Sequence, residues 1–226
     1  AASDVYKRQL NISEDIALIT MDDGKANAVS NTILEALENV LNEAEQKAKA
    51  VVLAGRPGLF CAGFDLKIMK SGSDEERAAL GNRGGWMVHR LYSFPKPIIA
   101  AATGHGIALG ALFLLGCDVR VGALGDYHFG LNETAINLPL PIFGLEVAEA
   151  RLARERLVEA VLQARLYQAK EAVTVGYLDH AVAPDKVISH SINIAHDLAA
   201  IPGKAYNENK QLMRRLTLST IAASLR

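Results

Sequence analysis

The 226-residue sequence predicts an α/β fold that is followed by an α-helical C-terminal part. Short apolar runs that are typical of buried strands alternate with helical patterns early in the chain, whereas helical patterns dominate after residue 145. Half of the residues are hydrophobic, which suffices for one large domain or a core with a small helical annex. We therefore expect a core over residues 10–183 and a helical region over residues 184–226.

The early elements follow from their apolar patterns and turn residues. We expect strands at 16–21, 50–54, 97–102 and 119–121, each bounded by a turn or a glycine. Ser30 stands where a helix N-cap belongs, because apolar residues follow it at helical spacing. A short apolar helix is expected to begin near Leu109 or Gly110.

The polar stretch 70–85 predicts a mobile loop and the start of a helix that runs to Pro95. Later helices are expected at 145–162, 169–176, 185–200 and after Gly203. Residues 1–9 match no structural pattern, and part of the segment looks like a translated sequencing adapter. We expect the native chain to begin near Leu10.

Composition excludes several classes of function. The chain has 24 Lys and Arg against 25 Asp and Glu, so nothing favours nucleic acid or an anionic membrane surface as a partner. The two cysteines, Cys61 and Cys117, lie far apart without a metal-ligand spacing, and we expect buried free thiols and no metal. With no candidate membrane span or signal peptide, the sequence predicts a cytoplasmic protein.

Two glycine-containing turns share one feature, because each follows a predicted strand and leaves backbone N–H groups free. Residues 59–66 follow a predicted strand and turn at Gly63, and residues 106–110 follow another strand and lead into a helix. Each leaves backbone N–H groups unpaired, and two such donors converging on one point form an oxyanion hole.

Glu133 lies in the mostly apolar segment 128–141. A carboxylate costs free energy in apolar surroundings, so it needs a partner or a function. The residue is therefore either a surface or capping residue of a loop, or a base directed at a substrate.

The motifs FCAGFDL at 60–66, IIAAATGHGIALGALFLLGCDV at 98–119 and FGLNET at 129–134 stand in this order, and residues 169–179 follow. Together they resemble the crotonase, or enoyl-CoA hydratase/isomerase, superfamily over nearly the whole chain. The resemblance implies a spiral of ββα turns, a C-terminal trimerisation region with a homotrimer or hexamer, and an acyl-CoA thioester substrate. Coenzyme A is then part of the substrate, and no further cofactor is expected.

The resemblance also implies the roles of individual residues. The backbone N–H groups of Phe64 and Leu109 would form the oxyanion hole, and Glu133 would be the acid–base residue. The family usually has glycine where this chain has Leu109, and we expect the leucine to narrow the conformations available there. Residues expected to line the substrate and CoA path are Ala62, Gly63, Phe64, Asp65, Leu66, Lys67, Gly110 and Leu112. Lys67 and Lys210 are candidates for contacts with CoA phosphates.

One departure from the family pattern bears on the reaction. Enoyl-CoA hydratases resemble one another in having two glutamates, and the first of these positions is Leu112 in this chain. A single carboxylate suits a Δ3-Δ2-enoyl-CoA isomerase, in which one residue moves a proton from C2 to C4. We expect Leu112, Phe113 and Ile136 to raise the pKa of Glu133 by desolvation.

Two alternatives remain open. One is a hydratase that uses Glu133 alone or with help from His105, and Leu112 argues against it. The other is a non-catalytic acyl-CoA binder. His105 and His128 are otherwise expected to be structural, Glu146 and Glu149 to be solvated, and Asp65 and Asp118 to hold a turn and a strand junction.

Overall fold

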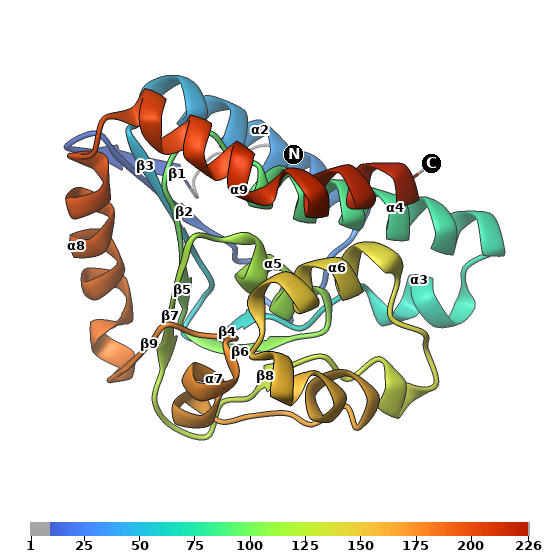
Figure 1. Ribbon diagram of the computed structural model, residues 1–226. Coiled ribbons are helices and arrows are strands. Elements are labelled where there is room, and N and C mark those ends of the chain that lie inside the picture. The colour runs from blue at the N-terminus through green and yellow to red at the C-terminus, as the bar shows by residue number, and fades with distance from the viewer. Residues whose placement is uncertain (1–9, 226) are drawn as a thin grey trace.

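The computed structural model describes residues 10–225 and has two sheets surrounded by helices (Figure 1). The strands are β1 Leu10–Ser13, β2 Ile16–Thr20, β3 Ala50–Ala54, β4 Gly58–Cys61, β5 Ile98–Ala102, β6 Gly104–Ile107, β7 Val119–Ala123, β8 Phe129–Gly130 and β9 His180–Val182. The helices are α2 Asn31–Lys47, α3 Leu66–Ser71, α4 Asp74–Tyr92, α5 Leu109–Gly116, α6 Ile142–Arg151, α7 Ala169–Val175, α8 Val187–Ala199 and α9 Gly203–Ser224.

The larger sheet has the strand order β1-β2-β3-β5-β7-β9. The β1–β2 pair is antiparallel, and the other described pairs are parallel. The smaller sheet has the order β4-β6-β8 and is parallel throughout. From β3 to β9, successive strands of the chain therefore alternate between the sheets. For example, β5 lies in the large sheet, β6 lies in the small sheet, and a helix follows them. This is the predicted spiral of ββα turns.

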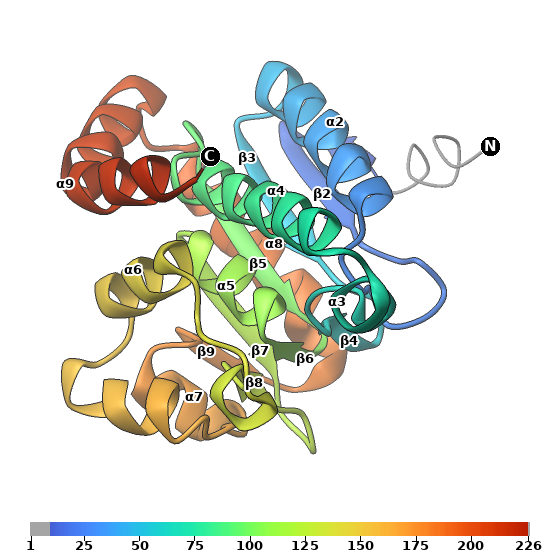
Figure 2. The same cartoon turned by 90° about the vertical axis from the view of Figure 1, so that its right-hand side faces the viewer.

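Side chains of the large sheet alternate between two hydrophobic clusters. In β3, Val51 and Leu53 face the main core with α2, α4 and α5, whereas Ala50, Val52 and Ala54 face α8. Figure 2 shows α8 behind the sheet and α2 and α4 in front of it. The helical C-terminal region thus packs on the core of its own chain, and the boundary predicted at residue 183 remains a prediction.

Most predicted elements are confirmed within one or two residues, including the Ser30 cap, whose side chain accepts a hydrogen bond from the Ile33 N–H. Within 70–85, the predicted mobile loop is limited to the two residues between α3 and α4, whereas the predicted helix start is confirmed in α4. A reciprocal capping box between Ser73 and Glu76 begins that helix, and it outweighs the polar composition. The segment 1–9 lies outside the described residues.

The helix predicted at 145–162 is also wrong in its extent. Helix α6 ends at Arg151, and a 3-10 turn and a π-helical turn follow it. The N–H of Ala153 donates to the carbonyl of Val175 at 2.9 Å, so the chain leaves the helix to pair with α7.

The cysteines are confirmed as buried free thiols, and burial raises the pKa of Cys61 and of Cys117 to about 12.

Among residues 10–225, no helix combines the length and apolar character needed to cross a bilayer. The same residues contain no cluster of three or more His, Cys, Asp or Glu side chains that suits a metal ion. The cytoplasmic location remains a prediction.

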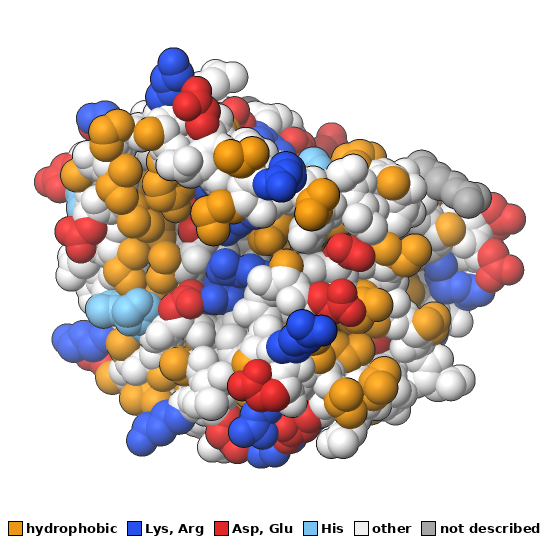
Figure 3. Space-filling model, viewed as in Figure 1, with side chains coloured by type: hydrophobic (Ala, Val, Ile, Leu, Met, Phe, Trp, Pro, Cys, Tyr) orange, Lys and Arg blue, Asp and Glu red, His pale blue; other side chains and the backbone are white. Residues whose placement is uncertain are grey.

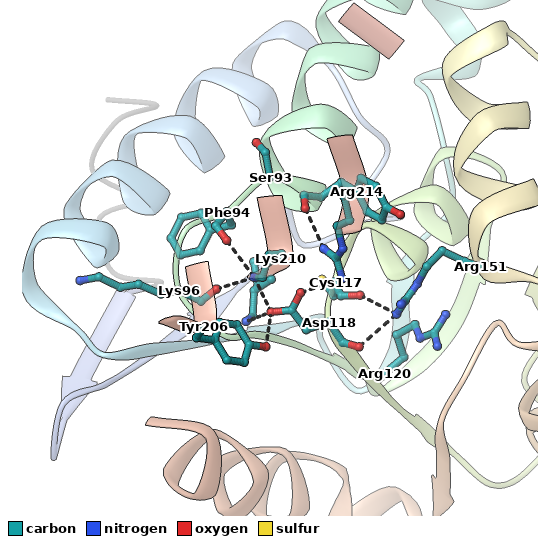
Figure 4. Close-up of polar contacts among 12 residues, drawn as sticks. Ser93, Phe94, Lys96, Cys117, Asp118, Arg120, Arg151, Tyr206, Lys210 and Arg214 are labelled. Carbon is teal, nitrogen blue, oxygen red and sulfur yellow. Dashed lines mark hydrogen bonds and ion pairs between the residues drawn. The ribbon is translucent and has the colours of Figure 1, made fainter. Parts of the chain in front are cut away.

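A buried ionic cluster fixes the C-terminal helix to the core (Figure 4). Asp118, at the start of β7, accepts hydrogen bonds from the Tyr206 hydroxyl at 2.9 Å and from Lys210 Nζ at 2.5 Å. Arg214 pairs with its other carboxylate oxygen at 2.9 Å. Asp118 also accepts from the Ile98 N–H, so it holds the strand junction as predicted.

Lys210 is only 6% exposed, and its ammonium also donates to the carbonyls of Phe94 and Lys96, both at 2.8 Å. The expectation that Lys210 contacts CoA phosphates is therefore wrong. Its sequence position on a polar helix indicated a surface lysine, whereas three acceptors from distant elements bury it.

Replacing Lys210 with Met should lower the free energy of unfolding by about 3 kcal/mol, because the buried carbonyls and Asp118 lose a charged donor. Urea unfolding measures the change. The matched control is Lys204→Met in the same helix, whose pair with Glu208 is exposed at 4.0 Å, and it should cost at most about 0.5 kcal/mol. Equal effects of the two substitutions would contradict the role given to the cluster.

Candidate active site

Three neighbouring parallel strands end at one edge of the small sheet. Phe64 follows β4, Leu109 follows β6 and Glu133 follows β8, each within three residues of the strand's last residue. The carboxyl ends of parallel strands lie side by side, and this edge is where ligands bind in open α/β sheets. The topology therefore brings together the three residues that the sequence singled out.

The backbone at Phe64 is oriented by its neighbours. The Val29 N–H donates to the Gly63 carbonyl at 2.8 Å, and the Asp65 N–H donates to the Val29 carbonyl at 3.0 Å. Phe64 lies between these two bonds and forms a parallel bridge with Val29. In such a bridge the middle residue points its own N–H away from the partner strand. Among the described residues, the Phe64 N–H has no acceptor.

Leu109 is the first residue of α5, where helical N–H groups have no partner within the helix. The Ala108 cap makes no side-chain hydrogen bond, and its N–H donates to the Gly130 carbonyl at 3.0 Å. The Leu109 N–H has no acceptor in the part of the chain that the structure describes. The positive end of the α5 dipole adds to the potential that this donor offers an anion.

The constraint on backbone conformation that we expected at Leu109 is found one residue earlier, at Ala108. Leu109 has an ordinary negative φ, whereas Ala108 has φ 55° and ψ −125°, a conformation that favours glycine. The expectation was wrong in its position, because the turn between β6 and α5 is completed before the helix begins.

The two donors lie close together because of Gly63. This residue has φ 95°, and a Cβ atom built on it would lie 3.6 Å from the Leu109 nitrogen and 2.9 Å from the Ala108 Cβ. Any side chain there would push α5 away from the β4 turn. Gly63 therefore allows the approach that an oxyanion hole requires.

The donors and Glu133 border one cavity of about 480 Å³. Its lining residues are Phe64, Met69, Arg77, Ala78, Gly81, Asn82, Leu109, Leu112, Glu133, Leu138, Pro139, Pro141, Ile142, Phe143, Ser224 and Leu225. Among these described lining residues, Glu133 is the only carboxylate.

Glu133 is held in an unusual state for a carboxylate. Burial raises its pKa above the ordinary value of 4.5, and the nearby backbone N–H groups of Asn132 and Glu133 offset this in part. Its Oε2 atom is buried and has no hydrogen-bond partner among the described residues. A carboxylate oxygen without a partner beside a cavity is available to take a proton from a bound molecule.

Backbone hydrogen bonds close the loop that carries Glu133. The Glu133 carbonyl accepts from the N–H groups of Ile136 at 3.1 Å and Leu138 at 2.9 Å, which closes a 3-10 turn. Tyr177 is fully buried, and burial, together with the charges of Tyr167 and Glu133, raises the pKa of its phenol. The Tyr177 phenol therefore lies close enough to Glu133 for the two groups to interact electrostatically.

Leu112 lines the cavity with Glu133, as the sequence predicted. Of the other residues expected to desolvate the glutamate, Phe113 is buried in the core away from the cavity lining, and Ile136 is 49% exposed. The 3-10 turn after Glu133 directs Ile136 outward, and the contributions of these two side chains to the desolvation remain predictions. The predicted direction of the pKa shift is confirmed.

Several residues assigned to the CoA path do not line this cavity. Ala62, Leu66 and Lys67 are exposed beside it, and Asp65 caps α3 by accepting from the Lys67 N–H at 2.8 Å. Gly110 packs against the Cys61 carbonyl, where a Cβ would lie at 2.2 Å. It is a packing residue, and the CoA contacts of the others remain predictions.

His105 also lies outside the cavity lining. Its Nδ1 accepts a hydrogen bond from the His128 N–H at 3.0 Å, and the two imidazoles stack with centroids 5.7 Å apart. Both rings are structural, as expected. A role for His105 in hydration gains no support from this placement.

Several lining residues were not predicted from the sequence. Leu138 and Phe143 come from the loop and helix after Glu133, and Gly81 belongs to the segment predicted to hold a mobile loop and the start of a helix. Leu225 reaches the cavity from the end of α9, which lies beside α4 in Figure 2. No local pattern could place the last turn of the chain at this site.

Comparison with known proteins agrees with this geometry. The family model described as enoyl-CoA hydratase/isomerase matches residues 11–225. The chain belongs to the enoyl-CoA hydratase/isomerase family. The resemblance to crotonases and the fold that it implied are thereby confirmed, and the family's substrates are acyl-CoA thioesters.

Some similar proteins are named as hydratases and others as isomerases. The chain is 29% identical over 74% of its length to a probable enoyl-CoA hydratase of Bacillus subtilis, and 30% identical over 83% to human mitochondrial enoyl-CoA delta isomerase 1. The matched regions span 66% and 61% of those two relatives' own lengths.

Solved structures resemble the whole chain. A family protein from Pseudomonas syringae has a TM-score of 0.95 at 32% identity, covering 100% of this chain and 96% of that one. Human mitochondrial delta3-delta2-enoyl-CoA isomerase has a TM-score of 0.90 at 27% identity, covering 95% and 86%.

The conformation of Ala108 gives a test of the turn. Ala108→Gly should raise the free energy of unfolding by about 1 kcal/mol, because relief of about 1–3 kcal/mol of backbone strain exceeds the entropic cost of glycine. Thermal or urea unfolding measures it. Ala111→Gly inside α5, where φ is ordinary, should instead destabilise by about 1 kcal/mol or more, and a destabilised Ala108→Gly variant would refute the strain.

Proposed function

We propose that the protein is a Δ3-Δ2-enoyl-CoA isomerase that uses Glu133 as a single proton shuttle. The observation that carries the proposal is the combination, around one cavity, of a carboxylate oxygen and two backbone N–H groups that have no partner among residues 10–225. Leu112 stands where a hydratase would have its other glutamate, and it lines the same cavity.

The proposed reaction follows from what each group can do. The thioester oxygen of a 3-enoyl-CoA accepts hydrogen bonds from the Phe64 and Leu109 N–H groups. Glu133 takes a proton from C2, and the electron pair moves toward the thioester oxygen to give a dienolate that the two donors stabilise. The protonated Glu133 then returns the proton at C4, which leaves the double bond between C2 and C3.

The raised pKa of Glu133 suits both halves of this cycle. A stronger base takes the C2 proton more readily, and the same group must then give the proton back. The apolar side chains around it, among them Leu112, Leu138 and Phe143, reduce the access of water that hydration would need. Coenzyme A enters as part of the substrate, and no further cofactor is required.

Hydration is the competing activity, because several relatives are named as hydratases. It requires a positioned water molecule and proton handling at two carbons. The cavity offers one carboxylate among its described residues, which favours the shuttle over water addition.

The assay follows the ultraviolet absorbance of the conjugated enoyl thioester formed from trans-3-hexenoyl-CoA. We expect turnover by the native protein and a loss of at least about 100-fold in Glu133→Gln, since the amide cannot accept the proton. Because burial raises the pKa of Glu133, the acid limb of kcat/KM should have its midpoint above pH 4.5.

Glu149→Gln on the exposed face of α6 is the control and should retain full activity. Conversion of trans-2-hexenoyl-CoA to the 3-hydroxyacyl thioester, without isomerisation, would instead establish a hydratase. Binding of both thioesters without turnover of either would show a non-catalytic acyl-CoA binder.

We further propose that the chain forms a homotrimer or a hexamer. Apolar side chains gather between α8 and α9 in Figure 3, where a groove of about 370 Å³ is lined in part by Leu198, Ile201 and Met213. Met213 and Leu216 are 83% and 73% exposed in the single chain. Such a patch is costly in water and suits a second copy.

Light scattering after gel filtration should give the mass of three or six chains. Met213→Asp should reduce it toward that of one chain, because burying a carboxylate against the apolar side chains of a second copy costs free energy. A native protein of single-chain mass would exclude the assembly.

A further inference from the structure

Helix α4 contains three glycines in its interior, Gly81, Gly84 and Gly85. A glycine inside a helix costs about 1 kcal/mol relative to alanine, so each needs a structural reason. Close packing explains Gly84 and Gly85, whereas it does not explain Gly81.

Gly84 and Gly85 allow other side chains to approach the helix. A Cβ atom built on Gly84 would lie 2.6 Å from the Phe64 ring and 3.2 Å from Leu109 Cδ2. One on Gly85 would lie 2.5 Å from Leu225 Cδ2 and 2.8 Å from Phe143 Cδ1. Both glycines are required for the walls of the active-site cavity to close.

Gly81 has no such neighbour. A Cβ atom built on it would meet no described heavy atom within 4 Å, and yet the residue is half-buried and lines the cavity. The missing side chain therefore leaves open space inside the site, and packing of the protein does not explain it.

The position of Gly81 relates this space to the reacting atoms. Gly84 contacts the side chains of both oxyanion-hole residues, and Gly81 lies three residues earlier, which is about 4.5 Å along the helix axis. Ala78 continues the same line one further turn away and also borders the cavity. A thioester held at Phe64 and Leu109 thus has this small-residue face of α4 beside the path of its acyl chain.

The chemistry of the lining suits a hydrocarbon. Met69, Leu138, Ile142, Phe143 and Leu225 are apolar. The guanidinium group of Arg77, which also borders the cavity, donates to the Gly72 carbonyl at 2.7 Å and pairs with Asp74, so it is already occupied.

We propose that Gly81 determines acyl-chain specificity, by leaving a channel along α4 for the part of a straight acyl chain beyond its first carbons. This inference rests on the proposed function only in taking an acyl-CoA thioester as the ligand. Each additional methylene that enters the channel should tighten binding about fourfold, which corresponds to ~0.8 kcal/mol.

The experiment measures dissociation constants by calorimetry for saturated butanoyl-, hexanoyl-, octanoyl- and decanoyl-CoA, which bind without reacting. The variants are Gly81→Ala and Gly81→Leu. Gly203→Ala and Gly203→Leu are matched controls, since Gly203 is also a helical glycine with no atom within 4 Å and lies outside the cavity lining.

The native protein and both Gly203 variants should bind more tightly as the chain lengthens. Gly81→Leu should bind butanoyl-CoA within about twofold of the native protein and decanoyl-CoA at least about tenfold more weakly, with Gly81→Ala between the two. Gly81→Ala should also melt at a higher temperature than the native protein, which shows that the lost affinity does not come from unfolding.

Equal affinity of Gly81→Leu and the native protein for decanoyl-CoA would overturn the inference, as would an equal loss at every chain length. Since these ligands do not react, the expected pattern without any isomerisation would refute the proposed activity alone. Isomerisation without the pattern would refute the role of Gly81 alone.

Discussion

The parallel pairing of β4, β6 and β8 is the constraint on which the site depends. The first pair is so close that a Cβ atom on Gly104 would lie 1.8 Å from the carbonyl carbon of Gly58, so the register admits no side chain there. The second pair is extended by the bond from the Ala108 N–H to the Gly130 carbonyl. A change in either register would move one of the three site groups relative to the others.

This arrangement explains why the site can contain features that are unfavourable for folding. Ala108 has a strained backbone. Among the residues that the structure describes, a buried Glu133 oxygen has no partner and no side chain caps the start of α5. Each costs free energy, and each persists because the surrounding sheet and core determine the local geometry. The α5 helix is buried along its whole length, so packing compensates for the unsatisfied N–H groups at its start.

Local patterns in the sequence predicted the parts of the site that are themselves local. The turns at Gly63 and Ala108 and the segment around Glu133 each carry their own signal, and their order matched a known family. The short strands β1, β4, β6, β8 and β9 were not predicted, because two to four residues are too few for a periodic signal. The capping box of α4 was present in the sequence at Ser73 and Glu76, but the polar composition of the segment concealed it.

Contacts between distant segments were beyond prediction for a physical reason. Lys210 has the sequence environment of an exposed helical lysine, and only the tertiary position of Asp118 and two carbonyls makes it a buried cation. Leu225 likewise borders the cavity only because α9 packs along α4 and α6.

These two observations are connected. The ionic cluster fixes the middle of α9, and Leu225 lies fifteen residues beyond Lys210, about four helical turns farther along the same helix. A rigid helix transmits that anchoring to its end, where Leu225 packs against α4 at Gly85. The C-terminal helix therefore closes one side of the acyl cavity because a buried carboxylate at the start of β7 holds it in place.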